Sequence, residues 1–115
     1  MDFNQLNYNQ DGLIPVMTQS VRTGNVLMQA FANAEAISLS LTTGYATYYS
    51  RSRKSIWKKG DTSGNRQKIV DIRVDCDEDS LLYLVDEEGA ACHTGKPTCF
   101  YRSLSGKDID QPMAY

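Results

Sequence analysis

The sequence has little histidine, tryptophan, proline or cysteine, and the small number of cysteines limits the kinds of fold and site that the protein can have. It contains one histidine, one tryptophan, three prolines and three cysteines in 115 residues. An odd number of cysteines does not suit a disulfide framework within one chain and fits a reducing compartment. Two interpretations of the cysteines remain, namely three buried free thiols or a thiolate metal site.

Long apolar runs and targeting signals are also lacking. No apolar run approaches the roughly 20 residues that span a bilayer. The polar start MDFNQLNYNQDG has neither the basic beginning nor the apolar middle of a signal peptide. A net charge of −2 gives no general reason to bind nucleic acid or anionic membranes. We therefore expect a cytoplasmic protein, with a single domain over residues 1–115.

The apolar pattern predicts mostly strands and one main helix, which is a β-rich α+β fold. The stretches LIPVMTQ (13–19) and VLMQAFA (26–32) flank a turn-like TGN and indicate a hairpin. Asn33 suits the N-cap of a helix over residues 33–44, and Gly44 suits its end. Ile37 and Leu41 are four residues apart within it.

The rest of the chain reads as strands joined by polar loops. In residues 67–76, Val70, Ile72 and Val74 alternate with Asp71 and Arg73, which gives the clearest strand pattern of the sequence. We expect further strands at 45–52, 56–59 and 81–86, a loop at 60–65 and a weakly ordered tail at 106–115.

An acidic cluster interrupts this pattern. Asp75, Asp77 and Asp79 share one side-chain parity in an extended chain, and Cys76 has the other. Same-side residues of a strand lie about 6.5–7 Å apart, so three carboxylates meet one cation only if the chain curls after Asp75. Magnesium prefers such oxygen ligands. An EF-hand is excluded, because Ser80 stands where its loop needs glycine. A solvated acidic turn and a magnesium site remain.

The three cysteines have spacings of sixteen and seven, which match no zinc finger. The turn-rich segment CHTGKPTC could return Cys99 towards Cys92, and three protein ligands with one open position is how catalytic zinc is held. Zinc lowers the pKa of bound water towards neutrality. His93, beside Cys92, would then be placed as a general acid or base, although a lone histidine is often structural.

The stretch YYSRSRKSIWKKGDTSGN (48–65) is basic and aromatic. If it continues a strand, Arg51 and Arg53 share one face. Arginine forks match phosphate oxygens, and loops rich in glycine and hydroxyls offer N–H groups to anions. A solvated strand edge or a single-stranded nucleic-acid site would use the same residues. One short patch on an acidic protein fits a small phosphorylated ligand better.

Together these segments resemble one family, the phosphoribosyl-AMP cyclohydrolases of histidine biosynthesis. The segments YYSRSRKSIWKKGDTSGN, VDCDEDSLLYLV and ACHTGKPTCFYR follow the order and separations of the family, and VLMQAFANAEA resembles its N-terminal half. The resemblance covers about residues 12–104. It implies hydrolysis of N1-(5-phosphoribosyl)-AMP, in which zinc-activated water adds at C6 of the adenine, with magnesium assistance, and the N1–C6 bond opens to give ProFAR.

The resemblance also implies two metal sites and an intertwined homodimer. Zinc would be held by Cys76 of one chain with Cys92 and Cys99 of the other, and His93 would relay a proton. Magnesium would be held by Asp75, Asp77 and Asp79. The nucleotide substrate would be bound by Arg51, Arg53, Trp57, Lys59, Thr62, Ser63 and Gly64.

Two features of the chain differ from many members of this family. Asn65 stands where many carry histidine, so any role of a second imidazole is missing. The chain stops at Tyr115 with no pyrophosphohydrolase domain after it, so we expect only the cyclohydrolase step. A non-catalytic nucleotide- or nucleic-acid-binding module and a purely structural thiolate site remain as the competing hypotheses.

Overall fold

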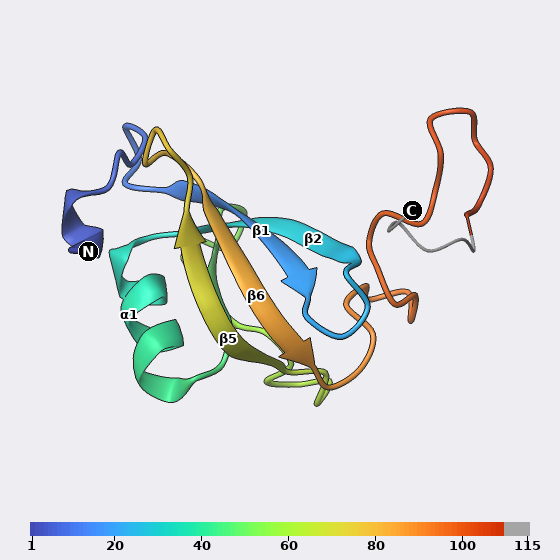
Figure 1. Ribbon diagram of the computed structural model, residues 1–115. Coiled ribbons are helices and arrows are strands. Elements are labelled where there is room, and N and C mark those ends of the chain that lie inside the picture. Colours follow the sequence, from blue (N-terminus) through green and yellow to red (C-terminus); the bar gives the residue numbers. More distant parts are fainter. Residues whose placement is uncertain (110–115) are drawn as a thin grey trace.

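A computed structural model describes residues 1–109 as one curled sheet of six strands with one α-helix packed against it (Figure 1). The small α+β domain predicted from the sequence is thereby confirmed. The elements follow the chain in the order η1 (Phe3–Gln5, a 3-10 helix), β1 (Ile14–Ser20), β2 (Val26–Ala32), α1 (Ala34–Thr43), β3 (Thr47–Ser50), β4 (Ser55–Lys58), β5 (Gln67–Val74) and β6 (Leu81–Glu87).

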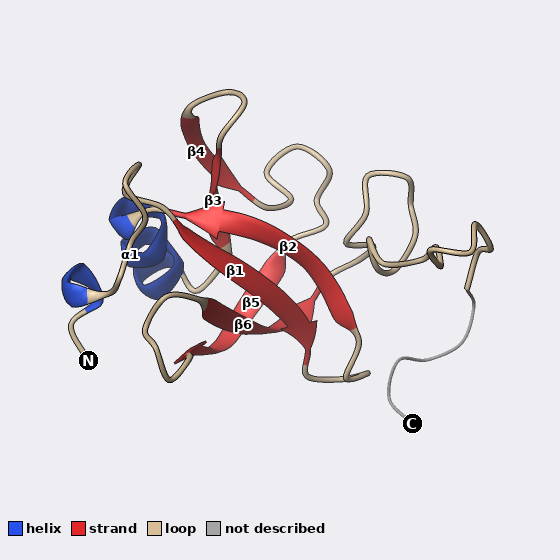
Figure 2. Ribbon diagram, turned by 90° about the horizontal axis from the view of Figure 1, so that it is seen from above, coloured by secondary structure: helices blue, strands red, loops and turns tan. Residues whose placement is uncertain are grey.

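The sheet has the strand order β4-β3-β2-β1-β6-β5 and is mixed. Strands β1 and β6 are parallel, and all the other neighbours are antiparallel. The sheet curls until the residues before β3 meet β5 at its far edge (Figure 2), where Ala46 N–H donates to Gln67 O at 2.8 Å and Ile69 N–H donates to Gly44 O at 2.8 Å. The core is formed by the side chains of this curled sheet together with Leu6 of the N-terminal segment and Ala36 and Ile37 of α1.

Two tyrosines occupy the centre of this core. Tyr48 and Tyr83 are fully buried, with ring centroids 5.4 Å apart. The Tyr48 hydroxyl donates to Gln67 Oε1 at 2.6 Å and lies 2.8 Å from Thr18 Oγ1, so a polar chain crosses the apolar interior. Desolvation raises the pKa of Tyr48 and raises that of Tyr83 to about 12. Both hydroxyls therefore stay neutral and act only as hydrogen-bonding groups at ordinary pH.

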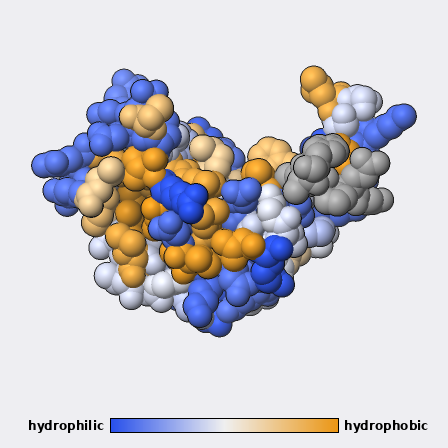
Figure 3. Space-filling model, viewed as in Figure 1, coloured by the Kyte–Doolittle hydropathy of each residue, from blue (hydrophilic) through white to orange (hydrophobic). Residues whose placement is uncertain are grey.

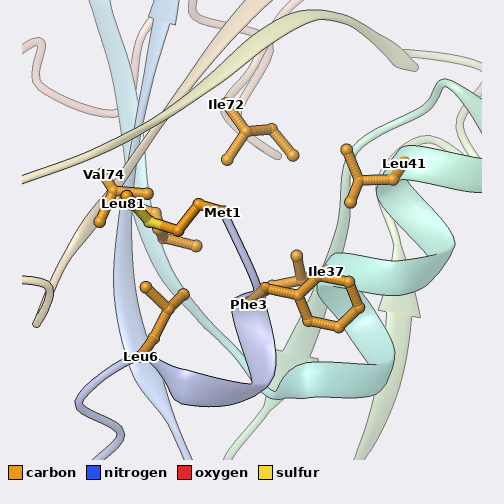
Figure 4. Close-up of a pocket in the computed structure, with 8 residues that line it drawn as sticks. All are labelled: Met1, Phe3, Leu6, Ile37, Leu41, Ile72, Val74 and Leu81. Atoms are coloured by element: carbon orange, nitrogen blue, oxygen red, sulfur yellow. The ribbon is translucent and has the colours of Figure 1, made fainter.

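The predicted helix is confirmed at both ends. The Asn33 side chain accepts from Ala36 N–H at 2.8 Å, and Gly44 ends the helix in the left-handed region at φ 78°. Ile37 is buried at 2% exposure, whereas Leu41 is 55% exposed. Leu41 lies at the mouth of a surface cavity of about 190 Å³ (Figure 4). The cavity is lined by Met1, Phe3, Leu6, Ile37, Leu41, Ile72, Val74 and Leu81.

The alternation predicted for residues 67–76 is wrong at one position. Val70 does not lie with Ile72 and Val74, because the register with β6 shifts between Ile69 and Asp71. This shift makes Val70 the extra residue of a β-bulge and leaves it 57% exposed. The predicted strand at 45–52 is also too long, since only residues 47–50 form β3 and residues 51–54 turn the chain into β4.

The remaining predicted strands lie within two residues of their expected bounds. The final segment differs in part from expectation, because Ile109 N–H donates to Tyr101 O at 2.7 Å and Arg102 bridges to Asp108. The rest of the tail predicted to be weakly ordered, residues 110–115, lies outside the described residues. At ten residues α1 is too short to cross a membrane, and no other helix within residues 1–109 is long and apolar enough to do so.

Candidate active site

The acidic residues form a tight loop between β5 and β6, residues 75–80, which we call the aspartate loop. The chain does curl after Asp75, since Asp75 Oδ1 accepts from the backbone N–H groups of Asp79 at 3.0 Å and Ser80 at 3.3 Å. Carboxylate oxygens of Asp75, Asp77 and Asp79 consequently lie within 4.8 Å of one another. Within residues 1–109 this is the only group of three or more potential metal-binding side chains.

The electrostatics of the aspartate loop differ from one carboxyl to the next. Hydrogen bonding from the backbone of Asp79 lowers the pKa of Asp75, whereas the hydrogen bond shared with the Asp75 side chain raises the pKa of Asp79. The N-terminal segment supports this loop, because Asn7 N–H donates to Glu78 O and Asn7 Nδ2 donates to Asp77 O, both at 2.8 Å. No sequence pattern had singled out Asn7, whose role depends on contact across about 70 residues.

Residues 91–99, which we call the thiol loop, bring Cys92 and Cys99 together. The loop folds back on itself through bonds from Cys92 N–H to Lys96 O at 3.2 Å and from Gly95 N–H to Cys92 O at 3.0 Å. Thr94 Oγ1 donates to Cys92 Sγ at 3.1 Å, and this bond is the main cause of a lowered pKa of Cys92, with the Cys99 thiol adding to it. Desolvation raises the pKa of Cys99, and neighbouring Cys92 raises it further.

A cavity of about 520 Å³ opens between β4, the loop at residues 60–65 and the thiol loop. Lys59 lies in its wall, where Nζ donates to Ala91 O at 2.6 Å and sits 5.5 Å from the Trp57 ring. Burial lowers the pKa of Lys59, and the nearby thiols of Cys99 and Cys92 act in the opposite direction. The cavity is lined by Arg53, Ile56, Trp57, Lys58, Lys59, Gly60, Asp61, Thr62, Ser63, Asn65, Ala90, Cys92, His93 and Gly95.

This cavity joins residues that the sequence had placed in separate motifs. Arg53, Trp57 and Lys59 from the basic stretch face the same space as Cys92 and the exposed His93. Thr62 and Ser63 line it too, and Gly64 is the next residue of that loop. Asn65, expected only as a departure from the family pattern, also lines the cavity.

The two arginines do not share a strand face, so that expectation is wrong. Both lie in the turn at residues 51–54, after β3 has ended. Arg53 lines the cavity, whereas Arg51 stacks over the Phe31 ring at 4.1 Å and lines a different hollow with Asp11 and Tyr49. The turn separates them because the chain must reverse within four residues to pair Ser50 with Ser55.

Cys76 lies apart from the other two cysteines. It belongs to the aspartate loop before β6, whereas the thiol loop follows β6. A strand of seven residues is roughly 20 Å long. Cys76 is exposed, and the three thiols do not form one group within residues 1–109.

Two neighbouring thiols and one imidazole at a basic, aromatic cavity, with a carboxylate cluster at the other end of β6, are a combination found in enzymes. Comparison with known proteins agrees, since the profile described as phosphoribosyl-AMP cyclohydrolase matches residues 28–101. The chain belongs to the phosphoribosyl-AMP cyclohydrolase family, and it is an enzyme of this family.

Several relatives are similar to the chain over nearly its whole length. A phosphoribosyl-AMP cyclohydrolase of Archaeoglobus fulgidus is 60% identical over 105 residues, which are 91% of this chain and 97% of the relative. That of Methanocorpusculum labreanum is 59% identical over 93% of this chain and 86% of its own length. The histidine biosynthesis bifunctional protein HisIE of Aquifex aeolicus is 54% identical over 96% of this chain, which spans only 55% of that protein.

Proposed function

We propose that the chain hydrolyses N1-(5-phosphoribosyl)-AMP to ProFAR, a step of L-histidine biosynthesis. The observation that carries this proposal is the cavity, which sets basic and aromatic side chains against Cys92 and His93. Its volume of about 520 Å³ lies in the range typical of small-molecule sites. The names of the relatives support the same reaction.

The residues present fit the two metals that this reaction is proposed to use. Zinc would be held by Cys76, Cys92 and Cys99, since thiolates are preferred ligands and the last two lie close enough to influence each other's pKa. Magnesium would be held by the oxygens of Asp75, Asp77 and Asp79, which lie within 4.8 Å of one another. When bound, zinc supplies water of lowered pKa as a nucleophile at neutral pH.

The side chains of the cavity have separate roles in this proposal. His93 is exposed next to Cys92, so its imidazole can move a proton between water and the ring nitrogen released when the N1–C6 bond opens. Trp57 packs near the base. In the cavity, phosphate is held by Arg53 and Lys59 together with Thr62, Ser63 and the adjacent Gly64, and Arg51 binds phosphate from the separate hollow that it lines.

In a homodimer that shares the zinc site, Cys76 of one chain could join Cys92 and Cys99 of the other, although these cysteines lie apart within each chain. Residues 100–109, which we call the arm, extend away from the sheet (Figures 1 and 2) and expose Phe100 and Leu104. Hydrophobic side chains also gather on the surface over α1 and β5 (Figure 3). Among the exposed hydrophobic residues are Leu41 of α1 and Val70 of β5. Such surfaces are typical of interfaces and support an intertwined dimer. Free cysteines support a cytoplasmic location.

The activity is tested with a near-ultraviolet time course of phosphoribosyl-AMP, purified chain and magnesium, run beside a sample treated with a zinc chelator. We expect turnover that the chelator stops and added zinc restores. Absence of turnover in metal-replete protein would contradict the proposed reaction, and turnover in the presence of chelator would contradict the zinc mechanism. Asp77→Asn should weaken the dependence of turnover on magnesium, whereas the zinc content of the protein, measured by mass spectrometry, should change less.

The shared zinc site is tested by mixing two inactive variants, Cys76→Ser and Cys92→Ser, after unfolding and refolding them together. Half of the resulting dimers are mixed, and each mixed dimer has one intact site of its two. We therefore expect about a quarter of the wild-type turnover from the mixture. A mixture as inactive as its components would contradict a site shared between two chains.

A further inference from the structure

Residues 91–99, the thiol loop, belong to no strand. The internal bonds of the loop define its shape but do not attach it to the sheet. Contacts at both of its ends do so. Lys59, the residue after β4, contacts the beginning of the loop, and Thr98 and the backbone N–H of Cys99 at its end contact β2.

Lys59 makes the first of these contacts. Its Nζ donates to Ala91 O at 2.6 Å, and Ala91 is the residue before Cys92. Ala91 is buried, so its carbonyl has little access to competing water. A short hydrogen bond from an ammonium group is stronger than a neutral one. This contact fixes the backbone that carries the first thiol.

Thr98 makes the second contact, directly before Cys99. Its Oγ1 lies 2.6 Å from Val26 O and 3.2 Å from Leu27 O, and it accepts from Phe100 N–H at 3.0 Å. Cys99 N–H donates to Leu27 O at 2.7 Å as well. The second thiol is therefore anchored to the first residues of β2, at the opposite end of the loop from Lys59.

We infer that Lys59 and Thr98 are positioning residues that fix the two ends of the thiol loop, and with them Cys92 and Cys99, before metal arrives, so that the two thiols bind as a preformed unit. This inference rests on the metal-binding role proposed above. A flexible loop would have to lose conformational freedom when it binds a metal, and a loop already fixed avoids most of that cost. We call the contacts made by Lys59 and Thr98 the two clamps of the thiol loop. Each clamp should raise the affinity of the loop for metal, although neither side chain binds the metal itself.

The role of Lys59 here differs from a phosphate contact, although the two are compatible. An ammonium group has three N–H donors, and the contact with Ala91 uses one of them. If Lys59 served the substrate alone, its loss would change the KM for phosphoribosyl-AMP and leave metal binding unaltered. Metal affinity measured without substrate separates these two roles.

The experiment titrates the metal-free full-length chain with Co²⁺ and follows the thiolate-to-cobalt charge-transfer absorption. The variants Lys59→Met and Thr98→Val remove one clamp each, and we expect each to weaken Co²⁺ binding about tenfold, the effect of one such hydrogen bond. Lys68→Met and Thr42→Val are the matched controls, since they remove the same groups from exposed residues of β5 and α1 that make none of the thiol loop contacts, and we expect changes below about twofold. Lys59→Arg and Thr98→Ser keep a donor and should restore most of the affinity.

Wild-type Co²⁺ affinity in both Lys59→Met and Thr98→Val would overturn the inference. Circular dichroism of the metal-free variants shows whether each one folds, and Thr98→Ala replaces Thr98→Val if the latter does not. Turnover of phosphoribosyl-AMP by the wild-type chain is measured in parallel. Absent turnover with weakened Co²⁺ binding in the variants would contradict the proposed function and support the clamps. Normal turnover with unaltered Co²⁺ binding would overturn the clamps alone.

Discussion

Replacement of Tyr48 by phenylalanine should destabilise the chain far more than the loss of one oxygen atom suggests. The Tyr48 hydroxyl connects Gln67 Oε1 and Thr18 Oγ1, and both partners are fully buried. Without the hydroxyl, a buried acceptor on Gln67 and a buried donor on Thr18 lose their partner. Each unsatisfied buried group costs about 1–3 kcal/mol, so we expect the free energy of unfolding to fall by about 2–4 kcal/mol.

The assay is urea unfolding at one fixed protein concentration, because association would couple stability to concentration. With an m-value of about 2 kcal/mol per molar urea, in the middle of the usual range, the midpoint of Tyr48→Phe should fall by roughly 1–2 M. Tyr49→Phe is the matched control, since Tyr49 is the next residue of β3 and is only partly buried, and its cost should stay below about 0.5 kcal/mol.

A double variant separates the hydrogen bonds from other effects of the substitution. Tyr48→Phe with Gln67→Leu removes both partners of the 2.6 Å bond and leaves no orphaned acceptor on residue 67. Its cost should be smaller than the sum of the two single variants by at least about 0.5 kcal/mol. A cost below about 0.5 kcal/mol for Tyr48→Phe alone would refute the reasoning, because the network would then contribute nothing beyond packing.

Two further predictions concern alkaline stability and one loop. The pKa of Tyr83 is raised from 10.0 to about 12, so its contribution of about 3 kcal/mol is fully present below pH 10 and is lost between pH 10 and about 12. Unfolding free energies over this range should fall less steeply in Tyr83→Phe, and parallel curves would contradict this. Gly60→Ala should lower the free energy of unfolding by at least about 2 kcal/mol more than Gly64→Ala does. Both glycines have φ near +80°, so alanine is similarly strained at either position, but only at Gly60 would the added Cβ lie 2.4 Å from Arg66 N. Equal thermal midpoints of Gly60→Ala and Gly64→Ala would contradict this prediction, because the backbone near Arg66 would then move aside without cost.

The features of the fold that could be predicted from the sequence depend on local signals. Asn33 and Gly44 define the helix through groups one turn away, and the first hairpin follows from two apolar stretches about a turn. The bulge at Val70 could not be predicted in this way, because it depends on the register with β6. The bridge from Tyr45 to Lys68, which closes the curl, depends likewise on a partner outside the local pattern.

In the candidate site, too, the features that depend on local sequence could be predicted, and those that depend on tertiary contacts could not. The aspartate cluster was predictable in composition, and its dependence on a curl after Asp75 followed from strand geometry alone. The cavity required tertiary structure, because Trp57 and His93 meet only when the thiol loop folds beside β4. Thr98 belonged to a recognised motif, but nothing in its spacing showed that its hydroxyl would contact β2.

The position of β6 between the two loops explains why the proposed catalytic centre needs two chains. The strand is paired on both sides inside the sheet, so the aspartate loop and the thiol loop stay at its opposite ends while its pairing with β1 and β5 holds. Because Cys76 directly follows Asp75, a site that takes this thiol from a partner takes the partner's aspartate loop with it. Zinc and magnesium would then lie side by side at one cavity although their ligands are far apart in each chain. In this proposal dimer formation and assembly of the active centre are a single event.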